Sequence, residues 1–286
     1  MGTRRRLDTE LVRRGLAPSR ERAQADIAAG RVTVGGAPAT KSSRLVDASE
    51  PVVVHGPPPK YVSRAGAKLE GAILHFGLES VVVGARVLDA GASTGGFTDC
   101  LLQFGATEVL AVDVGHNQLH ERLLADPRVH SIERTNLRTV DPALLGPPVD
   151  LVVGDLSFIS LALVLDTLIA ASKPGAIYVL LVKPQFEAGR REVSKGKGVI
   201  DNPIIWHRVL SEVSAALTER NAAIMGVMVS PITGSDGNVE FIMFGRFAGP
   251  ADDVVALTAL DDVALAAAFD EVTGRVEFDP SIDGGL

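Results

Sequence analysis

Residues 87–98 read Val-Leu-Asp-Ala-Gly-Ala-Ser-Thr-Gly-Gly-Phe-Thr, and this stretch decides the fold. It predicts an apolar strand ending in Asp89, a turn with three glycines, and the start of a helix. Glycine lets a backbone approach a ligand where a Cβ atom would clash, and a new helix offers free N–H groups. A second apolar strand over residues 109–112 ends in Asp113, where α/β sheets place an acid that binds a ribose. The stretch therefore predicts a nucleoside-binding turn; a glycine-rich turn without a ligand is the alternative.

The chain beyond residue 62 alternates apolar strands with helices. We expect strands near residues 86–89, 108–112, 129–132, 150–154, 176–182, 223–229 and 239–245. Helices are expected over residues 63–76, where Ser63 can act as the cap, and near residues 97–104, 159–172 and 203–219. This alternation predicts a doubly wound α/β sheet that the last two strands close.

The N-terminal part predicts a separate, small α+β domain. A helix over Leu7–Arg14 stops at Gly15, and Ser19 caps a second helix over Arg20–Ala29. Two strands near residues 31–34 and 51–54 follow, with a glycine hairpin turn between them. Residues 56–59 read Gly-Pro-Pro-Pro, a stiff linker. We expect a domain over residues 1–55, a linker over 56–62, the main domain over 63–250 and an acidic extension over 251–286, with an alanine-rich helix at 251–269.

The charges are distributed unevenly along the chain. The formal net charge is −7, yet residues 1–68 hold thirteen Lys and Arg against six Asp and Glu. A basic N-terminal part on an acidic body indicates nucleic-acid binding, although a basic stretch can also be a solvated surface. The sequence contains no apolar run long enough to span a membrane. No apolar stretch follows the basic residues 4–6, so we expect no signal peptide.

A single cysteine and six histidines limit disulfide and metal chemistry. Cys100 has no second cysteine to pair with, so we expect a small buried side chain in a reducing cytoplasm. His116, His120 and His130 lack the spacing of a metal set, and we expect no metal.

Four polar residues are expected at the edge where ligands bind in open α/β sheets. Asp155 and Lys183 each end a strand, Glu240 begins the last strand, and Lys68 lies on the first helix after the linker. Each residue alone would be a solvated element end, but two lysines and two acids at one edge suggest proton transfer. A lysine can take a proton only when its pKa falls toward the operating pH, through burial or a neighbouring cation.

These residues and motifs resemble a known family. The pattern L-x-x-x-L-V-x-x-G-L-A-x-S-R, followed by G-x-V-x-V-x-G, resembles the alpha-L RNA-binding domain. Lys68, Asp155, Lys183 and Glu240 match the Lys-Asp-Lys-Glu tetrad of FtsJ-like ribose 2′-O-methyltransferases. Together with A-G-A-S-T-G-G-F-T, D-L-S-F-I-S, V-K-P-Q-F-E and G-N-V-E-F, they resemble the TlyA family over residues 1–246.

The resemblance implies a Rossmann-like class I methyltransferase that transfers a methyl group from S-adenosylmethionine to cytidine ribose in ribosomal RNA. It implies Lys183 as the base, with Asp155 and Glu240 orienting the two lysines. The methionine half of the cofactor would lie against Asp89, Gly91, Ala92, Ser93, Gly95, Gly96 and Phe97. Asp113 would hold its ribose and Asn136 would read its adenine. Candidate RNA contacts are Arg4, Arg6, Arg14, Arg20, Lys41, Arg64, Arg190 and Lys195.

One departure and three alternatives remain. Mycobacterial TlyA proteins have an Arg-Ala-Trp-Val linker that helps to form the cofactor site, whereas residues 59–62 here read Pro-Lys-Tyr-Val. The alternatives are an RNA-binding protein with an inactive methyltransferase fold, a haemolysin-like pore former, and a dehydrogenase. The order D-x-G-x-x-x-G-G lacks the dinucleotide spacing G-x-G-x-x-G, which disfavours a dehydrogenase. We expect a cytoplasmic monomer that has ribosomal subunits as partners and does not bind membranes.

Overall fold

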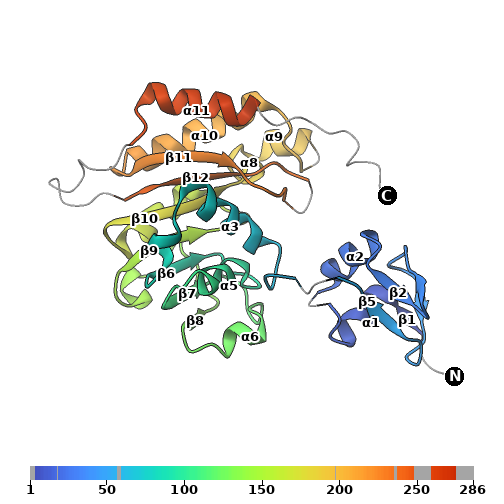
Figure 1. The fold of residues 1–286 in the computed structure, drawn as a ribbon. Helices are drawn as coiled ribbons and strands as arrows, with labels where there is room; N and C mark the ends of the chain where they lie inside the picture. The colour runs from blue at the N-terminus through green and yellow to red at the C-terminus, as the bar shows by residue number, and fades with distance from the viewer. Residues whose placement is uncertain are drawn as a thin grey trace. The chain divides into compact units, whose positions relative to one another are not determined.

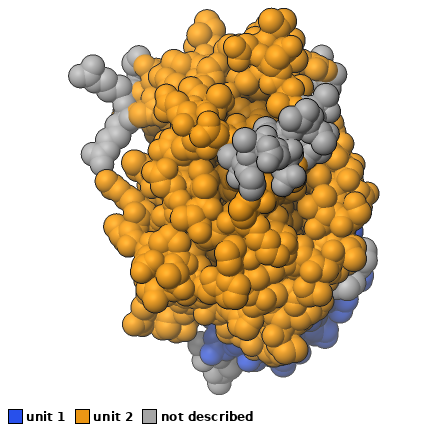
Figure 2. Space-filling model, turned by 90° about the vertical axis from the view of Figure 1, so that its left-hand side faces the viewer, with its two compact units in different colours: residues 1–60 blue, residues 61–286 orange. Residues whose placement is uncertain are grey.

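The computed structural model describes residues 4–17, 19–56, 59–196, 198–234, 237–247 and 259–274. The chain forms two compact units, the smaller over residues 1–60 and the larger over residues 61–286 (Figures 1 and 2). The larger unit begins at Tyr61, which is buried, and the Val62 N–H donates to the Asp99 carboxylate over 2.8 Å. Tyr61 and Val62 therefore pack with the larger unit.

The smaller unit packs two helices against short strands. The helices are α1 (Leu7–Arg13) and α2 (Arg20–Ala28), and the Ser19 side chain accepts from the Arg22 N–H at the start of α2. Strand β2 (Val32–Val34) pairs antiparallel with β3 (Ala37–Pro38) and β5 (Val52–Val54). Both helices, the Ser19 cap and the hairpin confirm the prediction. The pairing of β1 (Arg5–Arg6) with β4 (Leu45–Val46) was not predicted, because two-residue strands have no readable alternation.

The larger unit contains a seven-stranded sheet in the order β11-β12-β10-β9-β6-β7-β8. The strands are β6 (Arg86–Ala90), β7 (Glu108–Val112), β8 (Val129–Ile132), β9 (Val149–Gly154), β10 (Ser172–Val182), β11 (Ala223–Val229) and β12 (Phe241–Arg246). Strand β12 runs antiparallel to both of its neighbours, and the other strand pairs of this sheet are parallel. The doubly wound sheet with a closing strand pair confirms the prediction.

Helices cover both faces of this sheet (Figure 1). The helical segments are α3 (Ala65–Phe76), α4 (Glu79–Val82), α5 (Gly96–Gln103), α6 (Glu121–Leu124), η1 (Pro142–Leu145), η2 (Leu161–Leu163), α7 (Leu165–Ala170), α8 (Pro184–Glu187), α9 (Arg190–Lys195), α10 (Pro203–Thr218) and α11 (Asp262–Gly274). Alternate residues of each strand enter two cores. Leu88 packs in the core that α7, α10 and α11 complete, and Val87 packs in the core of α3 and α5, where Cys100 is buried as expected. In the described ranges, no helix is long and apolar enough to cross a membrane.

The order of the strands reverses between β6 and β9. From β6 the chain moves outward to β7 and β8, whereas β9 lies on the other side of β6 and continues to β10. In open α/β sheets, ligands bind outside the carboxyl ends of the strands at such a switch point. We therefore expect a ligand to bind beside the residues that follow β6 and β9.

Several expected boundaries were wrong. Ser63 is not a cap, because α3 begins at Ala65 without a side-chain cap bond. The helix expected at 159–172 divides into η2 and α7, and Ser172 already belongs to β10. Strand β10 begins before Pro174 because an irregularity in its pairing with β9, together with Gly175 at φ +76°, accommodates the proline. The C-terminal helix is shifted to Asp262–Gly274; residues 251–258 of the expected helix lie outside the described residues.

Candidate active site

The sheet brings together four charged side chains that lie far apart in the sequence. Asp155 directly follows β9, and Lys183 directly follows the parallel neighbour β10. Glu240 directly precedes β12, which starts at the same edge because Phe241 pairs with Val182 in antiparallel register. Glu240 therefore lies in a loop rather than inside the predicted strand. Lys68 reaches the group from α3.

The four side chains form an alternating chain of charges. Lys68 Nζ lies 2.6 Å from Glu240 Oε2 and 3.7 Å from Asp155 Oδ2, and Lys183 Nζ lies 2.5 Å from Asp155 Oδ1. All are largely buried, with side-chain exposures of 9% and 8% for Lys68 and Lys183. A buried charge is stable only when paired, and in this group each carboxylate has at least one ammonium beside it.

Lys183 has a second set of neighbours that the sequence analysis missed. Its Nζ donates to Ser157 Oγ over 2.9 Å and lies 5.8 Å from the centroid of the Phe186 ring. Phe158 is 90% exposed, has φ +64°, and its ring centroid lies 5.0 Å from that of Phe186. The signal was present in the motifs D-L-S-F and K-P-Q-F, which place these residues beside Asp155 and Lys183.

Asp89 provides a buried acceptor at the end of β6. Its Oδ2 accepts from Thr98 Oγ1 over 2.6 Å. Within the described part of the chain, Oδ1 has no hydrogen-bond partner although it is buried. Burial raises the pKa of Asp89 to about 7. An unpaired buried acceptor is costly, so this oxygen suits a ligand that brings a donor or a positive charge.

The glycines of the turn have different roles. Gly91 has φ +85°, and a Cβ atom there would lie 2.9 Å from the Asp155 carbonyl oxygen, so this glycine brings the turn against the charged group. Gly95 and Gly96 are buried: side chains of α6 and its preceding loop fill the space beside Gly95, and the residues around the start of α3 fill the space beside Gly96. Their lack of a Cβ atom serves packing rather than the approach of a ligand. Phe97 lies in the core.

Asp113 lies beside a small hollow at the end of β7. Its carboxylate accepts from the Ser93 N–H over 2.8 Å and from the Gly115 N–H over 2.7 Å, which fixes its orientation. Asn136 is exposed, does not line this hollow, and accepts from the Arg138 N–H. The hollow is lined by Ala92, Ser93, Ala111, Asp113, Gly115, Gln118, Leu119, Ser131 and Glu133.

The arginines of the smaller unit surround buried carboxylates. Arg6 donates to both oxygens of Asp8, and Arg20 donates to Asp8 Oδ2 over 3.0 Å; their side chains are nevertheless 45% and 57% exposed. Arg14 differs, because it is 18% exposed and donates to Glu10 and to three backbone carbonyls. Arg14 therefore ties the unit together, whereas Arg6 and Arg20 retain exposed surface.

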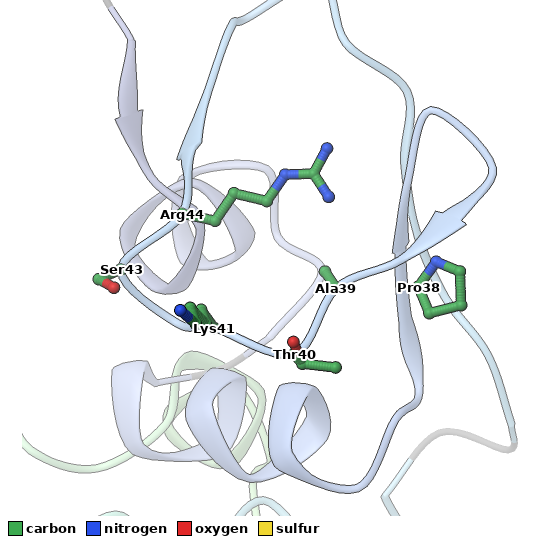
Figure 3. Close-up of a pocket in the computed structure, with 6 residues that line it drawn as sticks. All are labelled: Pro38, Ala39, Thr40, Lys41, Ser43 and Arg44. Atoms are coloured by element: carbon green, nitrogen blue, oxygen red, sulfur yellow. The ribbon is translucent and has the colours of Figure 1, made fainter.

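The other candidate RNA contacts occupy three places. Arg4, Lys41 and Arg64 are exposed. Lys41 contributes to an open hollow of about 320 Å³ in the loop between β3 and β4, which is lined by Pro38, Ala39, Thr40, Lys41, Ser43 and Arg44 (Figure 3). Arg190 and Lys195 lie in α9, and their side chains are outside the description. Among the residues that the structure describes, no cluster of His, Cys, Asp and Glu could hold a metal ion.

Comparison with known proteins identifies the family. A model described as FtsJ-like methyltransferase matches residues 61–247, and an S4 domain model matches residues 5–52. The chain belongs to the FtsJ-like methyltransferase family. Among its relatives is the Mycobacterium tuberculosis protein named 16S/23S rRNA (cytidine-2′-O)-methyltransferase TlyA, 47% identical over 93% of this chain and 98% of that protein. The match confirms the resemblance to the TlyA family.

Two further relatives carry the haemolysin name. Hemolysin A of Brachyspira hyodysenteriae is 40% identical to this methyltransferase over 83% of the chain and 98% of that protein. A solved structure of a hemolysin-named protein from Streptococcus thermophilus has a TM-score of 0.71 and 35% identity, covering 96% of this chain and 97% of that one. The methyltransferase fold with an N-terminal RNA-binding domain is confirmed by the two family matches.

The residues at the switch point fit S-adenosylmethionine. The cofactor carries an ammonium, a sulfonium and a ribose diol. The free Oδ1 of Asp89 suits the positively charged amino acid half. The carboxylate of Asp113 keeps lone pairs beyond its two backbone bonds, and those can accept from ribose hydroxyls. Gly91 places this region directly against the backbone of Asp155.

Proposed function

We propose that this enzyme transfers a methyl group from S-adenosylmethionine to the ribose 2′-hydroxyl of cytidine in ribosomal RNA. The observation that supports it most is the buried alternating group of Glu240, Lys68, Asp155 and Lys183 beside the Gly91 turn. The name of the Mycobacterium tuberculosis relative supports cytidine as the nucleotide and both ribosomal subunits as targets. An inactive methyltransferase fold is disfavoured, since all four residues of the tetrad are present and lie together at this edge.

Lys183 is the proton acceptor in this proposal. When bound, S-adenosylmethionine supplies a methyl group activated by its sulfonium. A ribose hydroxyl is a weak nucleophile at neutral pH, so the protein must orient it and take its proton. Lys68 Nζ lies between two carboxylates, whereas Lys183 Nζ has one carboxylate and the neutral Ser157 hydroxyl. Two carboxylates stabilise an ammonium more than one, which favours Lys183 as base and Lys68 as the residue that orients Asp155.

The cofactor would lie along the carboxyl ends of β6 and β7. Asp89 would face its ammonium and Asp113 its ribose. The turn of Gly91, Ala92 and Ser93 would border the methionine half, while Gly95, Gly96 and Phe97 shape that turn from beneath. The hollow near Asp113 does not include Asn136, so an adenine contact from Asn136 requires a move of its loop.

The exposed ring of Phe158 gives the substrate nucleotide a surface to stack on. It is held beside Phe186, whose ring also lies near Lys183. Stacking of a base on an aromatic ring contributes about 1–3 kcal/mol and tolerates different bases. A nucleotide turned out of its RNA helix would thus have its base on Phe158 and its ribose near Lys183.

The smaller unit would bind RNA in a way that depends on shape and phosphates. Arg4, Arg6, Arg20 and Lys41 provide exposed positive charge there, and Arg14 supports them from inside. Arg64, Arg190 and Lys195 would contact RNA from the larger unit. We propose that the enzyme acts as a monomer on ribosomal subunits in the cytoplasm, without a metal.

The test is transfer of labelled methyl from S-adenosylmethionine to purified small and large ribosomal subunits that lack the modification. Label on a cytidine ribose that disappears with Lys183→Ala would support both the reaction and the base. A protein that binds the cofactor but labels neither subunit would contradict the assigned substrate.

A further inference from the structure

Glu187 is a partly buried carboxyl group that the reaction above does not use. It ends α8, the short helix that begins directly after Lys183 and contains Phe186. Its Oε1 accepts from the Leu161 N–H over 2.8 Å, and it also interacts with the Ser160 hydroxyl. Burial raises the pKa of Glu187 above its usual range. A carboxyl group that loses water must be compensated by hydrogen bonds, and the Leu161 N–H and the Ser160 hydroxyl supply them here.

Glu187 is hydrogen-bonded to Ser160 and Leu161, which lie at the C-terminal end of the loop from Asp155 to Ser160. The loop starts where the Asp155 N–H donates to the Ala90 carbonyl over 3.0 Å. Between these anchors, Ser157 accepts from Lys183 and Phe158 presents its exposed ring. The loop is therefore fixed at one end by the sheet and at the other by Glu187.

The conformation of Phe158 needs such support. Its φ of +64° lies in the left-handed region, which a bulky side chain rarely adopts. Strained residues persist only where their surroundings determine the backbone, and they cluster at functional sites. The bond from Leu161 to Glu187 determines the backbone three residues after Phe158, and α8 supplies the ring that Phe158 packs against.

We propose that Glu187 is a positioning residue that clamps the Asp155–Ser160 loop to α8, so that Phe158 is ready to receive the base of the target nucleotide. Glu187 acts through Phe158 and Ser157 and does not touch the substrate. This proposal rests on the proposed function, because it assigns Phe158 to the nucleotide.

A double-mutant cycle between Glu187→Ala and Phe158→Ala tests this role in the full-length enzyme. We expect Phe158→Ala to lower kcat/KM for ribosomal subunits by about 10- to 100-fold, the loss of one stacked base. We expect Glu187→Ala to lower it by roughly tenfold and to add little in the Phe158→Ala background, because both changes remove the same contact. Affinity for S-adenosylmethionine should stay within about twofold, since Glu187 and Phe158 are not among the residues assigned to the cofactor at the ends of β6 and β7.

Two conservative variants and one control complete the design. Glu187→Gln keeps an oxygen for the Leu161 N–H and should retain activity within about threefold. Ser160→Ala removes one hydroxyl and serves if Glu187→Ala does not fold; we expect a small loss that Phe158→Ala again masks. Glu212→Ala is the control. Glu212 belongs to α10 and its charge acts on Glu187, but its side chain pairs with Arg208 at the surface. It should leave kcat/KM unchanged.

Hydrogen exchange separates the clamp from the reaction. Glu187→Ala should speed amide exchange over residues 156–163, whether or not ribosomal subunits are the substrate. Unchanged exchange there, or effects of Glu187→Ala and Phe158→Ala that multiply, would overturn the clamp. A wild-type enzyme that methylates neither subunit would instead overturn the proposed function and leave the exchange result standing.

Discussion

The buried carboxylates of the smaller unit and the Lys-Asp-Lys-Glu tetrad of the larger unit both lie beside cations, but the pairing differs. In the smaller unit, Asp8 and Glu10 are buried and receive arginines from nearby in the chain, such as Arg6, Arg13 and Arg20. Those arginine side chains remain 45%, 47% and 57% exposed. In the tetrad of the larger unit, both lysines and Glu240 are buried and the Asp155 side chain is 14% exposed, and the four residues come from separate parts of the chain.

The difference in cation explains the difference in use. Arginine stays charged in proteins and offers several donors in a fixed plane, whereas lysine can lose its proton when its surroundings permit. Arginines that pair with a buried carboxylate and keep part of their side chain in solvent make a positive surface. In the proposed function, the lysines that pair with carboxylates form the site that takes up the hydroxyl proton. The same pairing rule then provides a binding surface in one unit and a reaction site in the other.

Among exchanges of one cation for the other, we expect Lys183→Arg to cause the largest loss of activity. Lys183→Arg keeps the positive charge but cannot accept a proton, so we expect methyl transfer to ribosomal subunits to fall by about 100- to 10,000-fold. Cofactor affinity, measured by calorimetry, should change little. The reverse exchange, Arg6→Lys in the smaller unit, should alter turnover by no more than about threefold. An active Lys183→Arg enzyme would show that Lys183 is not the base.

The sequence predicted the charged residues at the strand ends better than it predicted the residues that pack around Lys183. Strand ends and glycines are local signals, so Asp89, Asp113, Asp155 and Lys183 could be placed at one edge of the sheet. Glu187, Ser157 and Phe158 could not be assigned, because their importance comes from contacts between the loop after β9 and the helix after β10. Periodicity does not report such contacts.

The same limit applies to the basic residues. Counting charges identified the smaller unit as basic, but it could not distinguish Arg14, which is turned inward, from Arg20, which is half exposed. The buried partners Asp8 and Glu10 look like ordinary first-turn helix acids in the sequence. Their burial depends on β4 and the loop before it, whose backbone carbonyls accept from the N–H groups at the start of α1.

Removing a carboxylate from the smaller unit should have the next largest effect. Glu10 accepts both donors of Arg13 and one of Arg14, and these arginines hold its pKa at about 2. Glu10→Ala leaves these arginines without their carboxylate, and the loss of stability is smaller than for a fully buried ion pair because Arg13 is 47% exposed. We expect Glu10→Ala to speed hydrogen exchange over residues 5–54 and weaken binding to ribosomal subunits.

Cofactor binding provides the control for Glu10→Ala. The residues assigned to S-adenosylmethionine all lie in the larger unit, so its affinity should be unchanged. Loss of cofactor affinity in this variant would mean that the two units do not fold independently.

Asp89 should give the cofactor affinity a pH dependence of intermediate size. The pKa of Asp89 is raised to about 7, so without a ligand the protonated side chain is the form that favours the folded protein. This contribution to the free energy of unfolding is fully present below about pH 4 and is lost as the pH rises through about 7. A positively charged ligand prefers the carboxylate. We therefore expect affinity for S-adenosylmethionine to increase by about tenfold between pH 6 and pH 8, measured by calorimetry. Asp89→Asn should remove this increase; an identical profile in the variant would assign it to another group.

The smallest expected effect distinguishes two arginines of the same unit. Arg20 is 57% exposed, and Arg14 is 18% exposed and bound to backbone carbonyls. If Arg20 contacts a phosphate, Arg20→Ala should lower the slope of log affinity against log salt by about one and weaken RNA binding a fewfold. Arg14→Ala should instead lower the thermal stability of the smaller unit, because its removal leaves carbonyls of the β4–β5 connection without a donor. Equal salt slopes for wild type and Arg20→Ala would show that Arg20 neutralises the buried Asp8 carboxylate without contacting RNA. The arginines of the smaller unit would then have a structural role, and only the lysines of the larger unit would retain a functional one.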